Sequence, residues 1–352
     1  MPIDATLAQY SNAFVYAAMA VFAVAFVAFA ASLAAGRGRA ELQDKAEAEA
    51  RSQSRIIRLT DSRSRAAVAA GAGISKPLAG VSHVATLDST AALSAEPLAP
   101  GRRAGNIGLS LMWLAMILLA AGVACRGFSA GRAPWGNMYE FSCASALSVS
   151  IVFLGISIKK DVRWLGVFVT GAVLLTLGIA VTVLYTESAQ LVPALKSYWL
   201  AIHVTAAIIC AGAFTVGAFV TALYLVRDSA ERKAGGAAVT GWLAPRVPSA
   251  DRLDAISYRI HAFVFPLWTF AVIAGAIWAE NAWGRYWGWD PKETWAFITW
   301  VIYACYLHAR ATAGWRGRKA AAIGLLGYGA FLFNYFGVNL LVSGLHSYGG
   351  VS

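Results

Sequence analysis

Charged residues are scarce in this chain. Asp, Glu, Lys and Arg make up 13% of its 352 residues, whereas a soluble globular protein carries about 25%. Hydrophobic residues reach 59%. This balance excludes a disordered chain, a coiled coil and most soluble nucleic-acid-binding proteins, and it indicates a protein that is embedded in a membrane.

Cysteine is also scarce. The chain has four cysteines, which form no CxxC pair and are too few for a disulfide scaffold: Cys125, Cys143, Cys210 and Cys305. A thiol-exchange role for this chain is therefore not expected. No internal repeat with a period of roughly 20–50 residues occurs, which argues against a solenoid fold.

Long apolar stretches are what the sequence does contain. A membrane-spanning helix needs about 20 apolar residues, because each residue adds about 1.5 Å of length. The sequence offers such stretches at residues 12–35, 106–125, 137–158, 164–185, 198–226, 257–280, 294–312 and 321–345. The first lacks the positively charged start of a signal peptide, so we interpret it as a true span. The sequence therefore predicts an all-α polytopic membrane protein with about eight transmembrane helices.

The basic residues lie mostly on one side of these spans. Alternate loops, together with Arg259, hold 24 of the 29 Lys and Arg residues. The opposite loops hold the other five, which are Arg126, Arg132, Lys196, Arg285 and Lys292. The positive-inside rule assigns the basic side to the cytoplasm, so both termini are expected to face outward. The net charge of +11 thus reports orientation, and nucleic acid is not an expected partner.

The segment 36–104 separates the first span from the others. It is rich in Ala, Arg, Ser and Gly and has no sustained apolar period. This composition predicts a flexible cytoplasmic linker between a first transmembrane helix at 1–35 and a membrane core at 105–352. A docking role for the linker stays open.

Tryptophan is concentrated between the sixth and seventh spans. Six of the 13 Trp lie within residues 278–300, in an outward-facing segment that contains Trp283-Gly-Arg-Tyr-Trp-Gly-Trp-Asp290-Pro. An interfacial aromatic belt is the alternative interpretation, but a belt spreads over many helix ends. Planar rings with basic side chains beside them suit a flat apolar ligand with acidic groups on one edge, and a porphyrin fits that description. The platform residues are Trp283, Arg285, Tyr286, Trp287 and Trp289, with Gly284 and Gly288 allowing close approach.

Four of the five histidines lie in or beside spans, where ionisable side chains are costly and tend to be functional. His203 and His346 are expected on the outer side, where they could bind one haem iron from opposite faces. His261 and His308 are expected in the inner leaflet, where they could form a second bis-histidine site. For each residue of this second pair, a hydrogen-bonded packing role is the alternative.

Three acidic residues on the outer side have open roles. Asp290 is a candidate haem-binding residue at the end of the Trp-rich run, and because it precedes Pro291 it also stands at a good N-cap position for the seventh span. Glu140 and Glu187 could orient a histidine, contact a partner or simply be solvated.

The run from Trp283 to Trp295 resembles the WWD signature of haem-handling proteins. The surrounding chain resembles the CcsA/ResC family of System II cytochrome c biogenesis over roughly residues 105–350. Other segments that carry the resemblance are 137–140, 191–203, 253–259, 306–310 and 346–348.

This resemblance implies that haem b is the bound substrate. It is presented on the outer face and joined through its vinyl groups to the CxxCH motif of apocytochrome c, with the chain as a subunit of a cytochrome c synthase, or haem lyase. The resemblance implies that His203 and His346 are axial ligands and that His308 is the membrane histidine, while it assigns no role to His261. It also implies a ResB-like partner, a bacterial plasma membrane and, as a further partner, a thioredoxin-like reductant.

Three alternatives stay open. The first is a CcmC- or CcmF-like haem handler, against which the Leu-Lys-Ser-Tyr-Trp run before His203 argues. The second is a transporter or channel without haem chemistry, which the few charges in the spans do not favour. The third is a scaffold that recruits a thioredoxin-like reductant. An absorption spectrum of the purified protein separates the haem-binding alternatives from the other two.

Overall fold

The structure is a computed structural model, and it describes residues 3–35, 101–190 and 195–346. These residues form helices and contain no strand. The long helices are α1 (Ala5–Ala35), α3 (Arg102–Ala130), α4 (Met138–Lys159), α5 (Gly166–Thr182), α6 (Tyr198–Ala234), α7 (Ala250–Trp283), α8 (Pro291–Ala311) and α9 (Arg318–Leu332). Each long helix lies on one of the predicted spans. The all-α polytopic fold is therefore confirmed.

Four short elements complete the described chain. The 3₁₀ turn η1 (Arg163–Leu165) leads into α5, and η3 (Ala244–Arg246) lies between α6 and α7. The π-helical turn η4 (Phe333–Gly337) and the short α10 (Val338–Leu341) continue α9. A π turn widens the helix locally and often occurs at a functional site. The last predicted span is thus one helical path with a distortion near its end.

Seven of the described helical segments are long and apolar enough to cross a membrane. The remaining predicted span, α8, has 21 residues and so reaches the length of a bilayer core, but it is less apolar. Trp, Tyr, His and Arg residues interrupt its aliphatic ones.

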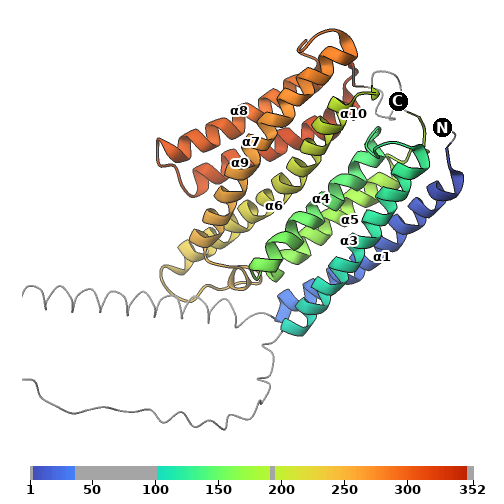
Figure 1. Cartoon of the computed structure of the whole chain (residues 1–352). Coiled ribbons are helices and arrows are strands. Elements are labelled where there is room, and N and C mark those ends of the chain that lie inside the picture. The colour runs from blue at the N-terminus through green and yellow to red at the C-terminus, as the bar shows by residue number, and fades with distance from the viewer. Residues whose placement is uncertain (1–2, 36–100, 191–194, 347–352) are drawn as a thin grey trace, which may run out of the picture.

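The helices form two adjoining groups (Figure 1). Helices α1, α3, α4 and α5 lie side by side in one group, and α6, α7, α8 and α9 make up the other. Helix α6 contacts both α4 and α7 and is the most buried of the membrane-spanning helices. Small residues let α4 and α6 approach closely, since a Cβ on Gly212 would lie 2.5 Å from the Ser148 Oγ.

Different helix ends and connections lie at the two ends of the bundle. The start of α1, the connection from α7 to α8 and the segment after α10 lie at one end (Figure 1), which we call the WWD end. The end of α1, the start of α3 and the connections α4–α5, α6–α7 and α8–α9 lie at the opposite end, which we call the basic end. The described start of α1 and the described residues after α10 thus lie at the same end of the bundle, as expected if both termini face outward.

Some of the sequence predictions fall outside the described residues. They include nearly all of the proposed linker at 36–104, of which residues 101–104 are described and belong to the start of α3. They also include residues 191–194 and 347–348 of the segments that carry the family resemblance.

Candidate functional site

A large cavity opens at the WWD end between the two groups of helices. It contains about 1200 Å³ of empty space, part of which is open to solvent. Its walls come from α4, from α6 to α10 with η4, and from the connections at this end. Five of the predicted site residues line it together: His203, Trp283, Tyr286, Trp287 and His346. The walls are mostly aromatic and aliphatic, with a few polar groups, as is usual for a site that binds a flat organic molecule.

His203 lies in the second turn of α6, which starts where the Ser197 hydroxyl accepts a hydrogen bond from the Trp199 N–H at 3.2 Å. The His203 Nδ1 lies 2.7 Å from the backbone oxygen of Ala271 on α7. A carbonyl oxygen only accepts, so Nδ1 carries the proton and Nε2 carries the lone pair of the neutral ring. Gly275 makes this contact possible, because a Cβ there would lie 2.8 Å from Nδ1.

His346 is held in a similar way by an acid. Its Nδ1 lies 2.8 Å from the Asp290 Oδ2, and the Leu345 N–H donates to Oδ1 of the same carboxylate at 2.8 Å. Asp290 also caps α8 by accepting a hydrogen bond from the Lys292 N–H at 3.3 Å, and Glu293 completes the capping box. The predicted N-cap is thus present, and the same carboxylate orients a histidine of the cavity.

The protonation of this pair follows from its surroundings. Burial raises the pKa of Asp290, but the hydrogen bonds from His346 and Leu345 outweigh burial and hold that pKa at about 2. Burial also lowers the pKa of His346, against the opposing effect of Asp290. An ionised Asp290 only accepts hydrogen bonds, so the proton of a neutral His346 ring lies on Nδ1. In both histidines, therefore, Nε2 is the nitrogen with metal-binding character.

Trp278 connects the two histidines. Its indole stacks on His203 with an interplanar angle of 9° and a centroid distance of 6.2 Å. It also meets the His346 ring at 5.8 Å, and Trp283 meets the same ring at 4.9 Å. Trp278 was inside the predicted Trp-rich segment but was not among the predicted site residues. Its place at the start of the Trp-rich segment 278–300 is the sequence signal that was available for it.

The remaining platform residues differ in position. Trp289 and Arg285 do not line the cavity. Trp289 is 63% exposed, has a positive φ of 58° and packs edge-on against Trp287 at 5.6 Å. Arg285 pairs with Glu293 at 3.4 Å and covers Gly288, where a Cβ would lie 1.8 Å from the Arg285 Nη1. Gly288 therefore makes room for an arginine instead of a ligand, which corrects the interpretation from the sequence.

Gly284 also has a structural role. It ends α7 in the left-handed region with φ +71°, where its N–H bonds to the Glu280 oxygen. Glycine is favoured at such a helix end because it has no Cβ. Gly284 was expected to let a ligand approach closely, but in the structure it ends α7.

Lys292, which the sequence offered as a partner for carboxylates of the ligand, lines the cavity, and so do Asn334, Tyr335 and Asn339, which were not predicted site residues. The Lys292 Nζ donates to the Asn339 Oδ1 at 2.8 Å, and both residues face the cavity. The turn η4 places Asn334 and Tyr335 on the same wall. The Asn334 Oδ1 is buried and has no hydrogen-bond partner among the described residues. Amides within an apolar predicted span were the available signal, since a buried polar group needs a partner.

The structure does not bring His261 and His308 together. His261 is fully buried, with its ring 5.2 Å from Tyr303 and 5.1 Å from Tyr306 of α8, and its Nδ1 lies 3.3 Å from the Ser257 Oγ. His308 is on the exposed surface of α8, near the end of that helix. Tyr303 and Tyr306 mark the buried face of α8, and His308 points away from it. The expected second bis-histidine pair is therefore not formed by this chain alone in the described residues.

Comparison with known proteins identifies the family. A family profile described as "Cytochrome C assembly protein" matches residues 135–346. The cytochrome c biogenesis protein CcsA of Synechococcus elongatus is 38% identical over 283 residues, which cover 69% of this chain and 87% of that protein. The CcsA protein of Microcystis aeruginosa is 36% identical over 302 residues, with coverage of 74% and 90%. The chain belongs to the CcsA family of cytochrome c biogenesis proteins.

A role in cytochrome c maturation follows from this membership, and with it an involvement of haem. The family match begins at Trp135 and ends at His346, and the residues that line the large cavity all fall between these two positions. The helices α1 and α3 precede the matched region. In this CcsA-family chain the cavity is thus built wholly from the part that defines the family.

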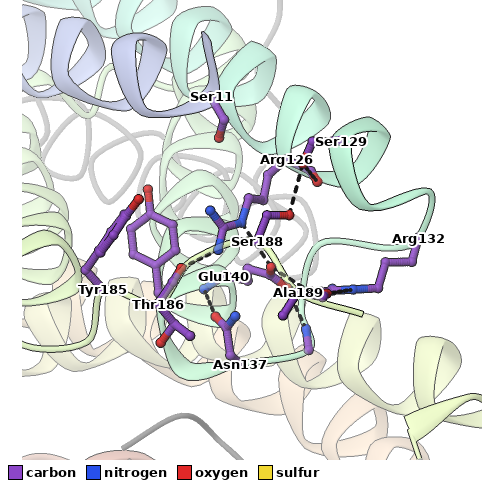
Figure 2. Close-up of polar contacts among 12 residues, drawn as sticks. Ser11, Arg126, Ser129, Arg132, Asn137, Glu140, Tyr185, Thr186, Ser188 and Ala189 are labelled. Carbon is purple, nitrogen blue, oxygen red and sulfur yellow. Dashed lines mark hydrogen bonds and ion pairs between the residues drawn. The ribbon is translucent and has the colours of Figure 1, made fainter. Parts of the chain in front are cut away.

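A buried ion cluster holds one wall of the cavity (Figure 2). Glu140 in the first turn of α4 is 2% exposed. It accepts hydrogen bonds from the Arg126 Nε at 3.1 Å, from the Arg132 Nη1 at 2.7 Å and from the Gly136 N–H at 2.8 Å. Glu140 is therefore neither solvated nor bonded to a histidine, which were two of the roles considered for it. The carboxylate instead compensates two buried or nearly buried arginines, as a charge in a dry interior requires.

The same cluster ties three segments together. Figure 2 shows the arginines reaching from the end of α3 to the chain after α5, where Arg126 donates to the Thr186 oxygen and Arg132 donates to the Ala189 oxygen at 2.9 Å. The Asn137 side chain caps α4 by accepting from the Glu140 N–H at 2.9 Å. Because Trp135, Gly136 and Asn137 line the cavity, the cluster fixes the loop that forms that wall.

Proposed function

We propose that this chain binds haem b in the cavity at the WWD end, with His203 and His346 as the axial ligands of the iron. One observation carries the proposal. Two histidines from distant parts of the chain share an aromatic cavity, and each has its Nδ1 bonded to an oxygen acceptor, Ala271 O or Asp290 Oδ2. Such a second bond is what orients a metal-binding imidazole and makes its Nε2 more basic.

The other cavity residues have matching roles in this proposal. Trp278, Trp283, Tyr286 and Trp287 supply apolar surface for the porphyrin faces and keep water from the iron. Lys292, which faces the cavity, supplies a cation for a propionate. Arg285 pairs with Glu293 and Trp289 packs outside, so both support the platform from behind.

The reaction we propose is haem attachment to apocytochrome c. Each thiol of the CxxCH motif adds across one vinyl group: a bond forms between sulfur and a vinyl carbon, and the thiol hydrogen goes to the other vinyl carbon. No net oxidation or reduction occurs. The chain contributes position, since fixing two reactants in the right orientation supplies much of the rate. This would make it a subunit of a cytochrome c synthase.

The orientation we propose puts the WWD end outside the bacterial plasma membrane and the basic end in the cytoplasm. The excess of Lys and Arg at the basic end supports it. Haem made in the cytoplasm must then cross the bilayer. The exposed His308 on α8 suits a ligand that is completed by a ResB-like partner, and His261 stays a buried residue of open function.

A thioredoxin-like protein is the proposed source of reduced thiols in apocytochrome c. This part of the proposal is supported by the chain's own cysteines, which are four in number and form no CxxC pair. Among the described residues none of these cysteines is in a disulfide. The chain therefore offers no dithiol of its own for exchange.

The test is an absorption spectrum of the complex purified from haem-replete cells. We expect the bands of a low-spin haem with two histidine ligands, lost in His203→Ala and in His346→Ala. A chain that is inserted normally but carries no haem would contradict the proposal. His83→Ala, in the predicted linker, is the matched control and should keep the spectrum.

A further inference from the structure

A second cavity lies at the basic end, far from the histidine pair. It contains about 1410 Å³ of empty space, part of it open to solvent. The end of α1, the start of α3, the connection between α4 and α5, and the connection between α6 and α7 surround it. Both groups of helices thus contribute to it. Nothing in the proposed haem chemistry uses this cavity.

Its lining is strongly basic. Among the described residues that line it, one is acidic, Asp161, and seven are basic: Arg102, Lys159, Lys160, Arg163, Arg246, Arg252 and Arg259. Asp161 binds Arg163 at 2.8 Å. Arg102, Lys159, Lys160 and Arg259 have no ion-pair partner in the described part of the chain. The positive charge of the cavity is therefore largely uncompensated, and an anion would be attracted to it.

Arg246 gives the most specific signal. It lies at the end of η3, and its guanidinium is 5.8 Å from the centroid of the Trp242 ring. Its Nε and Nη1 are both buried, and neither has a hydrogen-bond partner among the described residues. Buried donors are normally satisfied, and an arginine presents its donors in a fork that fits the oxygens of a phosphate. Two unsatisfied donors of one arginine thus point to an oxyanion.

The apolar part of the lining indicates where that oxyanion comes from. Leu33, Val162, Trp164, Val247 and Ile256 stand beside the basic residues. The cavity lies at the helix ends, where the headgroups of the adjacent leaflet are expected. Basic pockets between transmembrane helices on the cytoplasmic side bind anionic lipid headgroups.

We propose that this cavity binds the phosphate headgroup of an anionic phospholipid, with Arg246 as the residue that grips the phosphate. The lysines and arginines at its mouth supply the general attraction, and the apolar side chains contact the glycerol and the start of the acyl chains. A bound lipid would then link the α1–α5 group to the α6–α9 group at the end opposite the haem cavity. Free phosphate has the same chemistry, and the experiment separates the two sources.

The experiment measures lipid binding to the full chain by native mass spectrometry. The protein in detergent is offered phosphatidylglycerol or phosphatidylcholine, each with and without an excess of inorganic phosphate. We expect phosphatidylglycerol to bind more tightly than phosphatidylcholine. Arg246→Gln should weaken phosphatidylglycerol binding about fivefold, the effect of one basic side chain near a charged headgroup. Lys159→Gln combined with Lys160→Gln should weaken it more than about tenfold, and both of these lysines are exposed.

The control is Arg316→Gln, which removes an exposed charge of the same sign in the α8–α9 connection, outside the cavity. It should change binding by less than about twofold. Displacement by inorganic phosphate with no preference between the lipids would overturn the lipid source. Equal losses in the cavity variants and the control, or no anion binding at all, would overturn the site. Haem absorbance of the same samples should not change, so failure here is distinct from failure of the haem proposal.

Discussion

The histidines at the WWD end and those nearer the basic end make an instructive comparison. His203 and His346 line one cavity, and each has its Nδ1 bonded to a fixed oxygen. His261 and His308 lie on neighbouring helices but on different surfaces, one fully buried and the other exposed. Sequence position alone made the two pairs look alike. The difference shows that this chain brings His203 and His346 to one cavity and leaves His261 and His308 apart.

The geometry of α8 explains the separation. His308 follows Tyr306 by two residues, which turns it by roughly 200° around the helix. Tyr306 contacts His261, so His308 faces away from it. At the WWD end, by contrast, the helices end and the chain turns back. The segment after α10 can therefore carry His346 to Asp290. Neither residue lies within a helix, so the fixed spacing of a helix face does not restrict this contact.

The largest expected effect is at the first pair. His203→Ala or His346→Ala should lower holocytochrome c by more than about 100-fold, because losing a ligand should cost at least as much as losing an outer contact to a metal ligand. The measurement is haem staining of membrane cytochromes alongside an immunoblot of the chain. Added imidazole should restore part of the product. Normal holocytochrome in both variants would remove the ligand assignment.

The next largest effect is expected at Asp290, the acid that orients His346. Asp290→Asn should weaken haem binding by about 10–100-fold, since a metal-bound histidine depends on its outer partner to that extent. Asparagine caps a helix as well as aspartate does, so the melting temperature should hardly change. Haem titration and thermal unfolding of the same samples separate the two roles. The control is Glu280→Gln, which changes an exposed acid at the end of α7. An equal loss of haem affinity in that variant would contradict the prediction.

The third effect is on stability. Glu140→Gln leaves Arg126, which is 3% exposed, without its ionised partner. Breaking a buried ion pair costs about 3–5 kcal/mol of unfolding free energy. The exposed Glu187 offers the control, and Glu187→Gln should stay within about 0.5 kcal/mol. Unfolding in detergent, followed by circular dichroism, makes the measurement, and equal shifts in both variants would show that the cluster is not a structural anchor.

The smallest expected effect is the change in haem content caused by His308→Ala, which tests whether the second histidine pair forms within this chain. In the chain purified without a partner, His308→Ala should change haem content by less than about twofold, because an exposed side chain that meets no other histidine contributes little. With a ResB-like partner present, the same variant should reduce haem delivery. Haem loss from the isolated His308→Ala chain, as large as that of His203→Ala, would show that the second pair forms within this chain.

Local patterns predicted much of this molecule. Apolar length placed the eight long helices of the described residues, and the aromatic run located one wall of the cavity. Helix ends were less well predicted: α6 continues to Ala234, beyond the expected end at residue 226. Its last turns are charged and are held by pairs such as Arg227 with Glu231 at 2.6 Å, which leave no apolar pattern to recognise.

Long-range contacts were the part that patterns could not supply. The sequence left open whether Glu140 is solvated, orients a histidine or contacts a partner, yet it lies in a dry cluster because Arg126 and Arg132 reach it from the end of α3. Gly288 reads as an opening for a ligand, yet Arg285 occupies its free side. In each case the neighbour that decides the role is specified only when the chain folds.

The sequence by itself determined where the long helices of the described residues lie and which family the chain belongs to, and it gave an expected orientation, because apolar length, motif residues and charge bias are properties of short segments. Tertiary structure alone decided which polar groups share a cavity. His203 meets the Ala271 carbonyl only because Gly275 lets α6 and α7 approach, and His346 meets Asp290 only because the chain turns back after α10. Hydrogen bonds act over about 3 Å, so a functional site depends on packing that no local pattern encodes.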